Sequence, residues 1–159
     1  MHEFTSRPSI ISLREALKNN WQHFAWVFFY LLIAGALQLN IPYPWDNDTA
    51  YHAAVGKLIS EHGILHAFPW TPFSWLSDHY ADKELLFPLL FVPFASLNWT
   101  VASQIVGILT GATLLMTLYL LFSRENVRFP GLWTLVPLTC SVLFLFRFVL
   151  VRPHLLSIT

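Results

Sequence analysis

The chain has 159 residues, of which 55% are hydrophobic and only 11% are charged. Soluble domains carry about a quarter charged residues, so this chain has too few charges to cover a globular surface. Nine basic residues balance nine acidic residues, and a zero net charge gives no reason to expect a nucleic-acid partner. The composition therefore predicts an integral membrane protein.

Three apolar runs approach the length of about 20 residues that crosses a bilayer as a helix. After an N-terminal segment at 1–23, we expect transmembrane helices at 24–41, 99–123 and 132–151. A fourth apolar run at 85–97 is shorter and contains Pro88 and Pro93, which bend helices. We expect it to lie at the membrane interface or to enter it obliquely. The predicted class is all-α, with about three spans and a long loop at 42–98.

Basic residues predict the orientation of these spans, because cytoplasmic loops are enriched in lysine and arginine. Three basic residues precede the first span, and the link at 124–131 carries Arg124 and Arg128. The 42–98 loop holds only Lys57 and Lys83 against six acidic residues. We therefore expect a multi-pass protein of the cell (inner) membrane, with a cytoplasmic N-terminus and an outward loop. A cleaved signal peptide ending near "AGA", residues 34–36, is the alternative for the first apolar run.

The loop opens with "DNDTAYHAAVGKLISEHG", residues 46–63, which reads as a helix that ends at Gly63. Asp48 is expected to be its N-cap, and residues 51, 55, 58 and 62 are expected to form one apolar face on the membrane. A helix N-terminus keeps a carboxylate ionised, which suits a cap, a metal ligand and a base equally well. His52 lies one turn beyond Asp48, so the two side chains can share a ligand or a proton.

Two further groups of polar residues are candidates for a site. Asp82 and Glu84 lie with Asp78 and His79 before the 85–97 run, where carboxylates suit a hard cation or the start of a helix. At the other end of the chain, "FRFVLVRPHLLS" places Arg147, Arg152 and His154 at the outer end of the third span. Arginine binds phosphate through its planar fork. Snorkelling to the interface is the alternative for both arginines.

These motifs together resemble the N-terminal part of the GT-C superfamily of membrane glycosyltransferases. That superfamily includes catalytic subunits of oligosaccharyltransferase, protein O-mannosyltransferases and lipid A aminoarabinose transferases. "DTAYHAAVGKLISEHG" is similar to the helix after the first span of that family, "DKELLFPLLFVPFASL" to its second interfacial helix, and "RPHLLS" to a basic outer turn. The resemblance covers nearly the whole chain. A "DE" pair that marks some branches is absent, which favours the oligosaccharyltransferase-like pattern.

The resemblance implies sugar transfer from a polyprenyl-phosphate donor to an acceptor glycan, lipid or protein at the outer face of the membrane. By its register Asp48 takes the catalytic position, with Asp46 as the alternative and His52 beside it. Arg152, Arg147 and His154 then bind the donor phosphate. Some relatives use a divalent cation, Mg or Mn, for which Asp46 and Asp82 are the candidate ligands.

The family has more spans than this sequence, which stops at "HLLSIT" where a fourth span is expected to begin. We therefore expect the chain to be part of a larger GT-C fold, with 152–159 as the start of an outer turn or a fourth span. A non-catalytic membrane subunit and a transporter fragment are the alternative functions. The absence of charged residues from the first two spans favours a site at the outer face over a path through the membrane.

Overall fold

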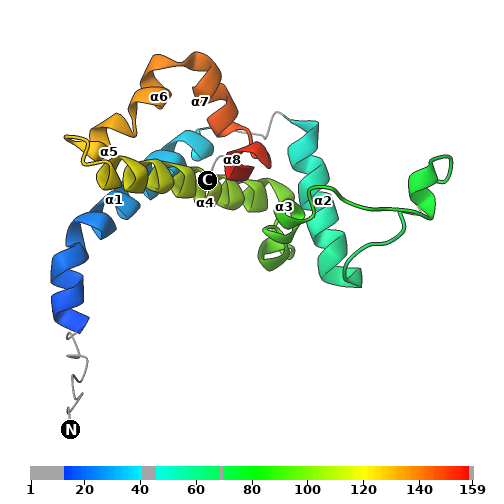
Figure 1. Ribbon diagram of the computed structural model, residues 1–159. Helices are drawn as coiled ribbons and strands as arrows, with labels where there is room; N and C mark the ends of the chain where they lie inside the picture. Colours follow the sequence, from blue (N-terminus) through cyan, green and yellow to red (C-terminus); the bar gives the residue numbers. More distant parts are fainter. Residues whose placement is uncertain (1–12, 41–45, 69, 158–159) are drawn as a thin grey trace, which may run out of the picture.

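The computed structural model describes residues 13–40, 46–68 and 70–157, and most of this length is helical (Figure 1). By length and composition, two of its helices can cross a membrane: the Asn20–Leu39 part of α1 (Leu13–Leu39), and α4 (Trp99–Arg124). The all-α class is thus confirmed for the described residues, and two helices, or up to three if the bent pair counts as one span, are long and apolar enough to cross a membrane. The first half of the expected 1–23 segment, the 41–45 connection and residues 158–159 lie outside the described residues.

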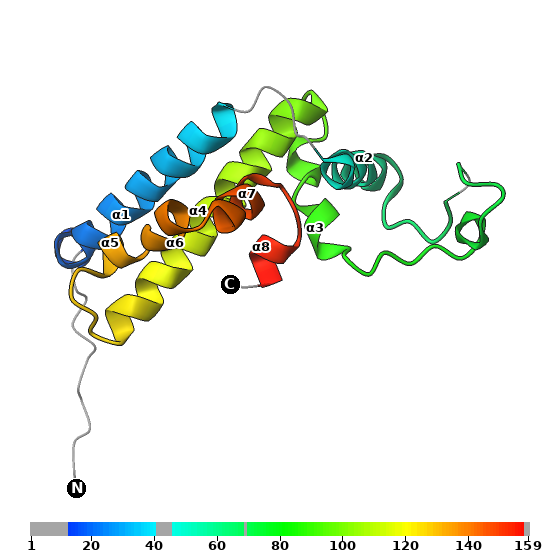
Figure 2. The same ribbon diagram turned by 90° about the horizontal axis from the view of Figure 1, so that it is seen from above.

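Helices α1 and α4 pack side by side in antiparallel directions and make the most extensive contact in the molecule (Figure 2). Tyr30 and Ala34 of α1 and Leu115 of α4 are completely buried between them. On the opposite side of α1, Phe24, Phe28 and Leu32 are each more than half exposed. A face of large exposed apolar side chains on a span-length helix suits contact with lipid.

Helix α4 runs without interruption because its polar groups find partners inside the helix. Asn98 caps its start by accepting a hydrogen bond from the Thr100 amide at 2.9 Å. The hydroxyls of Ser103 and Thr110 donate to carbonyls one turn earlier, at 2.7 and 2.8 Å, which satisfies them in an apolar setting. The expected second span at 99–123 therefore matches α4 closely. In contrast, α1 starts well before residue 24, because the polar stretch before the apolar run is also helical.

The third expected span, 132–151, is not one straight helix. It is divided into α5 (Pro130–Trp133), α6 (Val136–Cys140) and α7 (Val142–Val149), and the axis bends by 97° between Cys140 and Val142. Pro137 lies at the start of α6 and lacks the amide that would bond to Trp133, which explains the first break. At the second break Ser141 is extended, and its hydroxyl accepts from the Phe144 amide at 3.1 Å, which starts α7 afresh.

The bent segment and the residues directly after it pack on Gly107 and Gly111, the two glycines of "GILTG" in α4. A Cβ at Gly111 would lie 2.8 Å from the Phe148 ring, and one at Gly107 would lie 2.9 Å from a methyl group of Val151. Both contacts are closer than a larger residue allows, so these glycines allow close packing. A short helix, α8 (His154–Ser157), follows the bent segment and also packs on α4.

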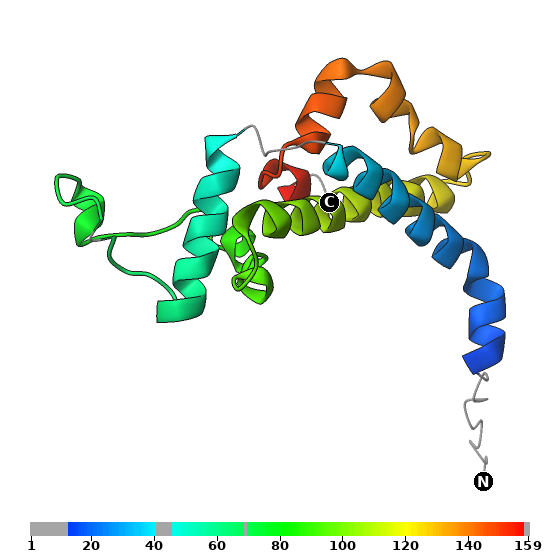
Figure 3. The same ribbon diagram turned by 180° about the vertical axis from the view of Figure 1, so that it is seen from behind.

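Helix α2 (Asn47–His62) runs crosswise to α1 and α4, at the end of the pair where α4 begins (Figures 1 and 3). If α4 crosses the membrane, this direction places α2 along the membrane surface. Of the face of α2 that was expected to lie on the membrane, Val55 is buried and Tyr51 and His62 are exposed. The residues of α2 that pack inside the protein are Thr49, His52, Ala53, Val55, Gly56 and Ile59.

Small residues decide which face of α2 is buried. A Cβ at Gly56 would lie 2.6 Å from the Cβ of Phe91 and 2.7 Å from the Pro88 carbonyl oxygen. The facing segment is the 85–97 run, which forms two short turns, α3 (Leu86–Leu89) and η2 (Val92–Phe94). The rest of the loop contains η1 (Trp75–Ser77) and extends beyond α2, away from the spanning pair (Figures 1 and 3).

Candidate functional site

Two aspartates lie at the N-terminus of α2, in roles that differ from those expected. Asp46, not Asp48, is the N-cap: its backbone is extended and its carboxylate accepts from the Asp48 amide at 3.3 Å. The prediction of Asp48 as the cap is therefore wrong by two residues. Asp48 lies in the first turn of the helix, with a side chain that is 59% exposed. Capping consequently does not account for Asp48.

Arg152 joins both aspartates, although it lies more than 100 positions away in the sequence. Its Nε and one terminal nitrogen donate to the two oxygens of Asp46, the second at 2.6 Å, in a bidentate pair. The same terminal nitrogen lies 3.2 Å from a carboxylate oxygen of Asp48. Bidentate pairs of this kind fix geometry as well as adding energy. The structure thus brings three of the predicted site residues together.

Side chains of α1 and α2 hold the backbone that carries Arg152. The Gln38 amide donates to the Val149 carbonyl at 3.0 Å, and the Thr49 hydroxyl donates to the Val151 carbonyl at 3.2 Å. These carbonyls are available because α7 ends at Val149 and the chain continues extended at Leu150. Gln38 and Thr49 are both buried, and a buried polar group needs a partner of this kind. The two bonds position Arg152 over the start of α2.

A pocket of about 430 Å³ opens beside the ion pair. Asp46, Arg147, Arg152 and His154 line it together with apolar side chains of α7. Arg147 is exposed and forms no ion pair with any described residue. His154 places its Nε2 3.2 Å from the Arg147 carbonyl oxygen. The three residues predicted to bind phosphate therefore share one pocket, and a carboxylate forms part of its wall.

His52 does not contact Asp48 as expected. Its Nε2 lies 3.5 Å from a carboxylate oxygen of Glu84, and its Nδ1 is buried with no hydrogen-bond partner among the described residues. The ring also packs edge-on against Phe87. Burial lowers the pKa of His52, and the carboxylates of Glu84, Asp82, Asp48 and Asp46 only partly oppose this. His52 is thus a neutral residue between α2 and the segment before α3.

Asp82 belongs to a separate network on the same side of α2. It accepts from the Tyr80 hydroxyl at 3.3 Å and from the Glu84 amide at 2.8 Å, and the Tyr80 hydroxyl lies 2.7 Å from that of Tyr51. Burial and the hydrogen bond with Tyr51 raise the pKa of Tyr80, which therefore stays protonated.

The residues expected as cation ligands, Asp46 and Asp82, both form hydrogen bonds within the protein. The oxygens of Asp46 are paired with Arg152 and those of Asp82 with Tyr80 and Glu84. Within residues 13–40, 46–68 and 70–157, no three His, Cys, Asp or Glu side chains are grouped so that they could hold a metal ion. In this arrangement both aspartates already have partners for the oxygens that a cation would use.

The electrostatics of the ion pair give the two aspartates different properties. Hydrogen bonds from Arg152 hold the pKa of Asp46 below its ordinary value of 3.8, and its side chain is only 10% exposed. Asp46 is therefore a permanent counter-ion that fixes the guanidinium. Asp48 makes one longer contact to the same guanidinium and is open to solvent, so it can exchange partners. The arrangement offers one fixed cation and one accessible carboxylate side by side.

Sequence reasoning missed Gln38 and Thr49 as residues that position the site, and gave Glu84 only a general role. Of these residues, only Gln38 could have been recognised from the sequence, because a lone amide in an apolar span needs an interior partner. Thr49 follows an aspartate in an ordinary helix start, and nothing in its neighbours distinguishes it. Family models, curated proteins and solved structures were each compared with the chain, and none of them matches it.

Proposed function

We propose that the protein is a membrane glycosyltransferase, or the part of one that carries its acidic outer loop. Its donor would be a sugar linked to a polyprenyl phosphate or diphosphate, and the acceptor would approach from the outer face of the membrane. The single observation that carries this proposal is the contact of Arg152 with both Asp46 and Asp48 beside a pocket that also contains Arg147 and His154. A cation for a leaving phosphate and a carboxylate for an acceptor proton then lie within one site.

In the proposed reaction, the acceptor nucleophile attacks C1 of the sugar. The bond between C1 and the phosphate oxygen breaks, and its electron pair leaves with the lipid phosphate. The acceptor proton moves to the Asp48 carboxylate, which acts as general base. Arg152 stabilises the negative charge that grows on the leaving phosphate, with Arg147 as a second cation. Asp46 takes no part in proton transfer, because its bidentate pair keeps Arg152 in position.

Donor binding would change the contact between Asp48 and Arg152. Asp48 and a phosphate oxygen would compete for the same terminal nitrogen of Arg152, which Asp48 approaches at 3.2 Å. Since Asp46 retains the other contacts of the guanidinium, the phosphate can displace Asp48 without moving Arg152. The displaced Asp48 carboxylate would then be free to approach the acceptor.

The decisive experiment is transfer from a panel of polyprenyl-phosphate sugars by membranes that contain the protein, with Asp48→Asn as the test variant. Asparagine keeps the shape of the side chain but cannot accept the proton, so transfer should fall by about 100- to 10,000-fold, while donor binding persists. Asp78→Asn is the matched control, because Asp78 is an exposed aspartate of the same loop. Unchanged transfer in Asp48→Asn would disprove the role of Asp48 as base. Donor binding without any transfer by the unaltered protein would favour a non-catalytic subunit.

A further inference from the structure

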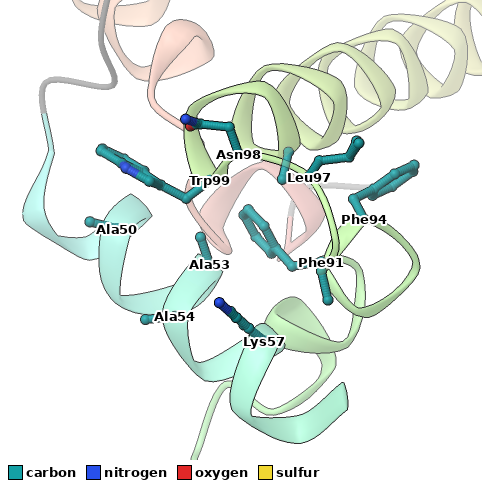
Figure 4. Close-up of a pocket in the computed structure, with 11 residues that line it drawn as sticks. Ala50, Ala53, Ala54, Lys57, Phe91, Phe94, Leu97, Asn98 and Trp99 are labelled. Atoms are coloured by element: carbon teal, nitrogen blue, oxygen red, sulfur yellow. The ribbon is translucent and has the colours of Figure 1, made fainter. Parts of the chain in front are cut away.

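A second concave site lies on another face of α2. It is a groove of about 460 Å³ between α2, η2 and the start of α4 (Figure 4). Three alanines of α2, Ala50, Ala53 and Ala54, form one wall, and Phe91, Phe94 and Trp99 form much of the other. A concave, mostly apolar surface of this volume is typical of a small-molecule site.

Lys57 is the only charged residue that lines this groove. In Figure 4 its side chain extends from α2 among the lining residues. Lys57 is exposed, and its ammonium pairs with no carboxylate of the described residues. The other polar residue of the lining is Asn98, whose side-chain oxygen already caps α4. The groove therefore offers an apolar surface and one uncompensated positive charge.

The position of the groove indicates what it binds. It lies where the crosswise helix α2 meets Trp99, the first residue of α4. Trp99 is 44% exposed, and tryptophan is enriched at the boundary between hydrocarbon and headgroups. At that depth an apolar groove meets acyl chains, and a lysine beside it meets lipid phosphates.

The groove is separate from the site that holds Arg152. Along α2, Ala50, Ala53 and Lys57 follow one another at i, i+3 and i+7, which places them on one face of the helix. Asp48 precedes Ala50 by two residues, and positions two apart on a helix face different directions. Occupation of the groove therefore leaves the ion pair of Asp48 and Arg152 in place. This inference does not depend on the proposed glycosyl transfer.

We propose that this groove binds an anionic membrane phospholipid. An acyl chain lies against the alanines and Phe91, and the phosphate group pairs with the Lys57 ammonium. One lysine at a membrane surface contributes enough attraction to raise the affinity for an anionic lipid about fivefold. The bound lipid then fills the space between α2 and the start of α4.

The test measures lipids retained by the purified protein, by native mass spectrometry in mild detergent. Phosphatidylglycerol and phosphatidylcholine with identical chains are the two probes. The unaltered protein should retain phosphatidylglycerol in preference, and Lys57→Met should weaken that binding about fivefold while leaving phosphatidylcholine unaffected. Lys83→Met is the matched control: it removes the same charge from an 89% exposed side chain that does not line the groove. Equal retention of the two lipids, or equal losses in the two variants, would overturn the proposal.

A second variant tests the apolar part of the groove. Ala54→Leu adds bulk at an exposed position in its wall and should lower retention of both lipids, with no change in the unfolding temperature of the protein. Full retention by Ala54→Leu would place the lipid elsewhere and overturn the proposal. Displacement of phosphatidylglycerol by equimolar polyprenyl phosphate, in a manner that requires Lys57, would also overturn it. The groove would then belong to the donor.

Discussion

Helix α4 and the 130–149 segment are both rich in apolar residues, but α4 is one continuous helix and the 130–149 segment is bent. They differ in the contacts that hold each segment in place. Helix α4 is continuous over Trp99–Arg124 and packs along α1 through buried apolar side chains. The 130–149 segment bends by 97° and depends on two glycine contacts and on polar side chains near its end. A continuous span needs only its own helix and an apolar neighbour, whereas a bent one needs specific partners from other parts of the chain.

The largest loss of stability is expected from Arg152→Met, which removes a contact made just after the end of the bent segment. It would leave the nearly buried Asp46 carboxylate without its bidentate partner. Because Arg152 is partly exposed, we expect a loss at the low end of the range for broken ion pairs, about 2–3 kcal/mol. The free energy of unfolding of the two proteins in detergent measures this loss.

Arg147→Met is the control, because Arg147 is an exposed arginine in the last turn of the preceding helix α7, and it should stay within about 0.5 kcal/mol of the unaltered protein. Asp46→Asn combined with Arg152→Met should recover part of the loss, since no buried charge then remains. Equal stability of Arg152→Met and Arg147→Met would mean that the pair does not hold the segment.

Next in size is Gly111→Leu, which attacks the packing of the bent segment on α4. A Cβ at this position already comes within 2.8 Å of the Phe148 ring, and that ring is 1% exposed and cannot move aside. Overpacking of this kind costs about 2 kcal/mol. The same unfolding measurement applies. Gly35→Ala on α1 should cost nothing, because the nearest atom to its Cβ is 4.0 Å away; a comparable loss there would remove the distinction between the two contacts.

The helix caps offer a smaller and closely matched comparison. Ser141 caps α7 and Asn98 caps α4, each by accepting one amide hydrogen bond. Replacing either with alanine should cost about 1 kcal/mol. The two variants should differ in a second measurement. Ser141→Ala should also raise the rate at which a thiol reagent labels Cys140, which is next to the break, whereas Asn98→Ala should leave that rate unchanged. Equal labelling in both variants would contradict a local role for Ser141.

The smallest expected effect is a pH dependence at α2. Burial lowers the pKa of His52 below its ordinary value of 6.5, so the unfolded chain takes up the proton first as the pH falls. Stability should therefore decrease as the pH falls below about 6.5 and level off once the folded-state histidine is also protonated. His52→Gln should remove this decrease. A stability that rises on acidification through this range would mean that the ring is charged in the folded protein.

The sequence predicts the straight parts of this fold well. Residues 99–123 were expected as a span, and α4 begins and ends within a residue of those bounds, because an apolar run of this length that contains no proline continues as one helix. The bend at Ser141 could not be predicted, since one serine in an apolar run caps a new helix only if Phe148 and Val151 have glycines to pack on. The face of α2 that packs inside the protein could not be predicted either, because Gly56, a residue with no side chain to bury, decides it.

For the site, residue types were easier to predict than partners. The helix start and the family resemblance indicate Asp46 and Asp48, and the basic turn after the third apolar run indicates Arg152; the structure places the three in contact. His52 was expected beside Asp48 because helical spacing permits it, but Glu84 provides a carboxylate from another segment. Local spacing limits which residues can meet, and tertiary packing selects among them.

The ion pair of Asp46 with Arg152 also has a consequence for biosynthesis. The two residues are 106 positions apart, and a chain is made from its N-terminus, so both aspartates leave the ribosome long before their arginine. Helix α2 can form early, but its first turn is anchored only after the 130–149 segment has been made and has bent back over α4. A chain that stalls before residue 152 therefore leaves both carboxylates without this arginine.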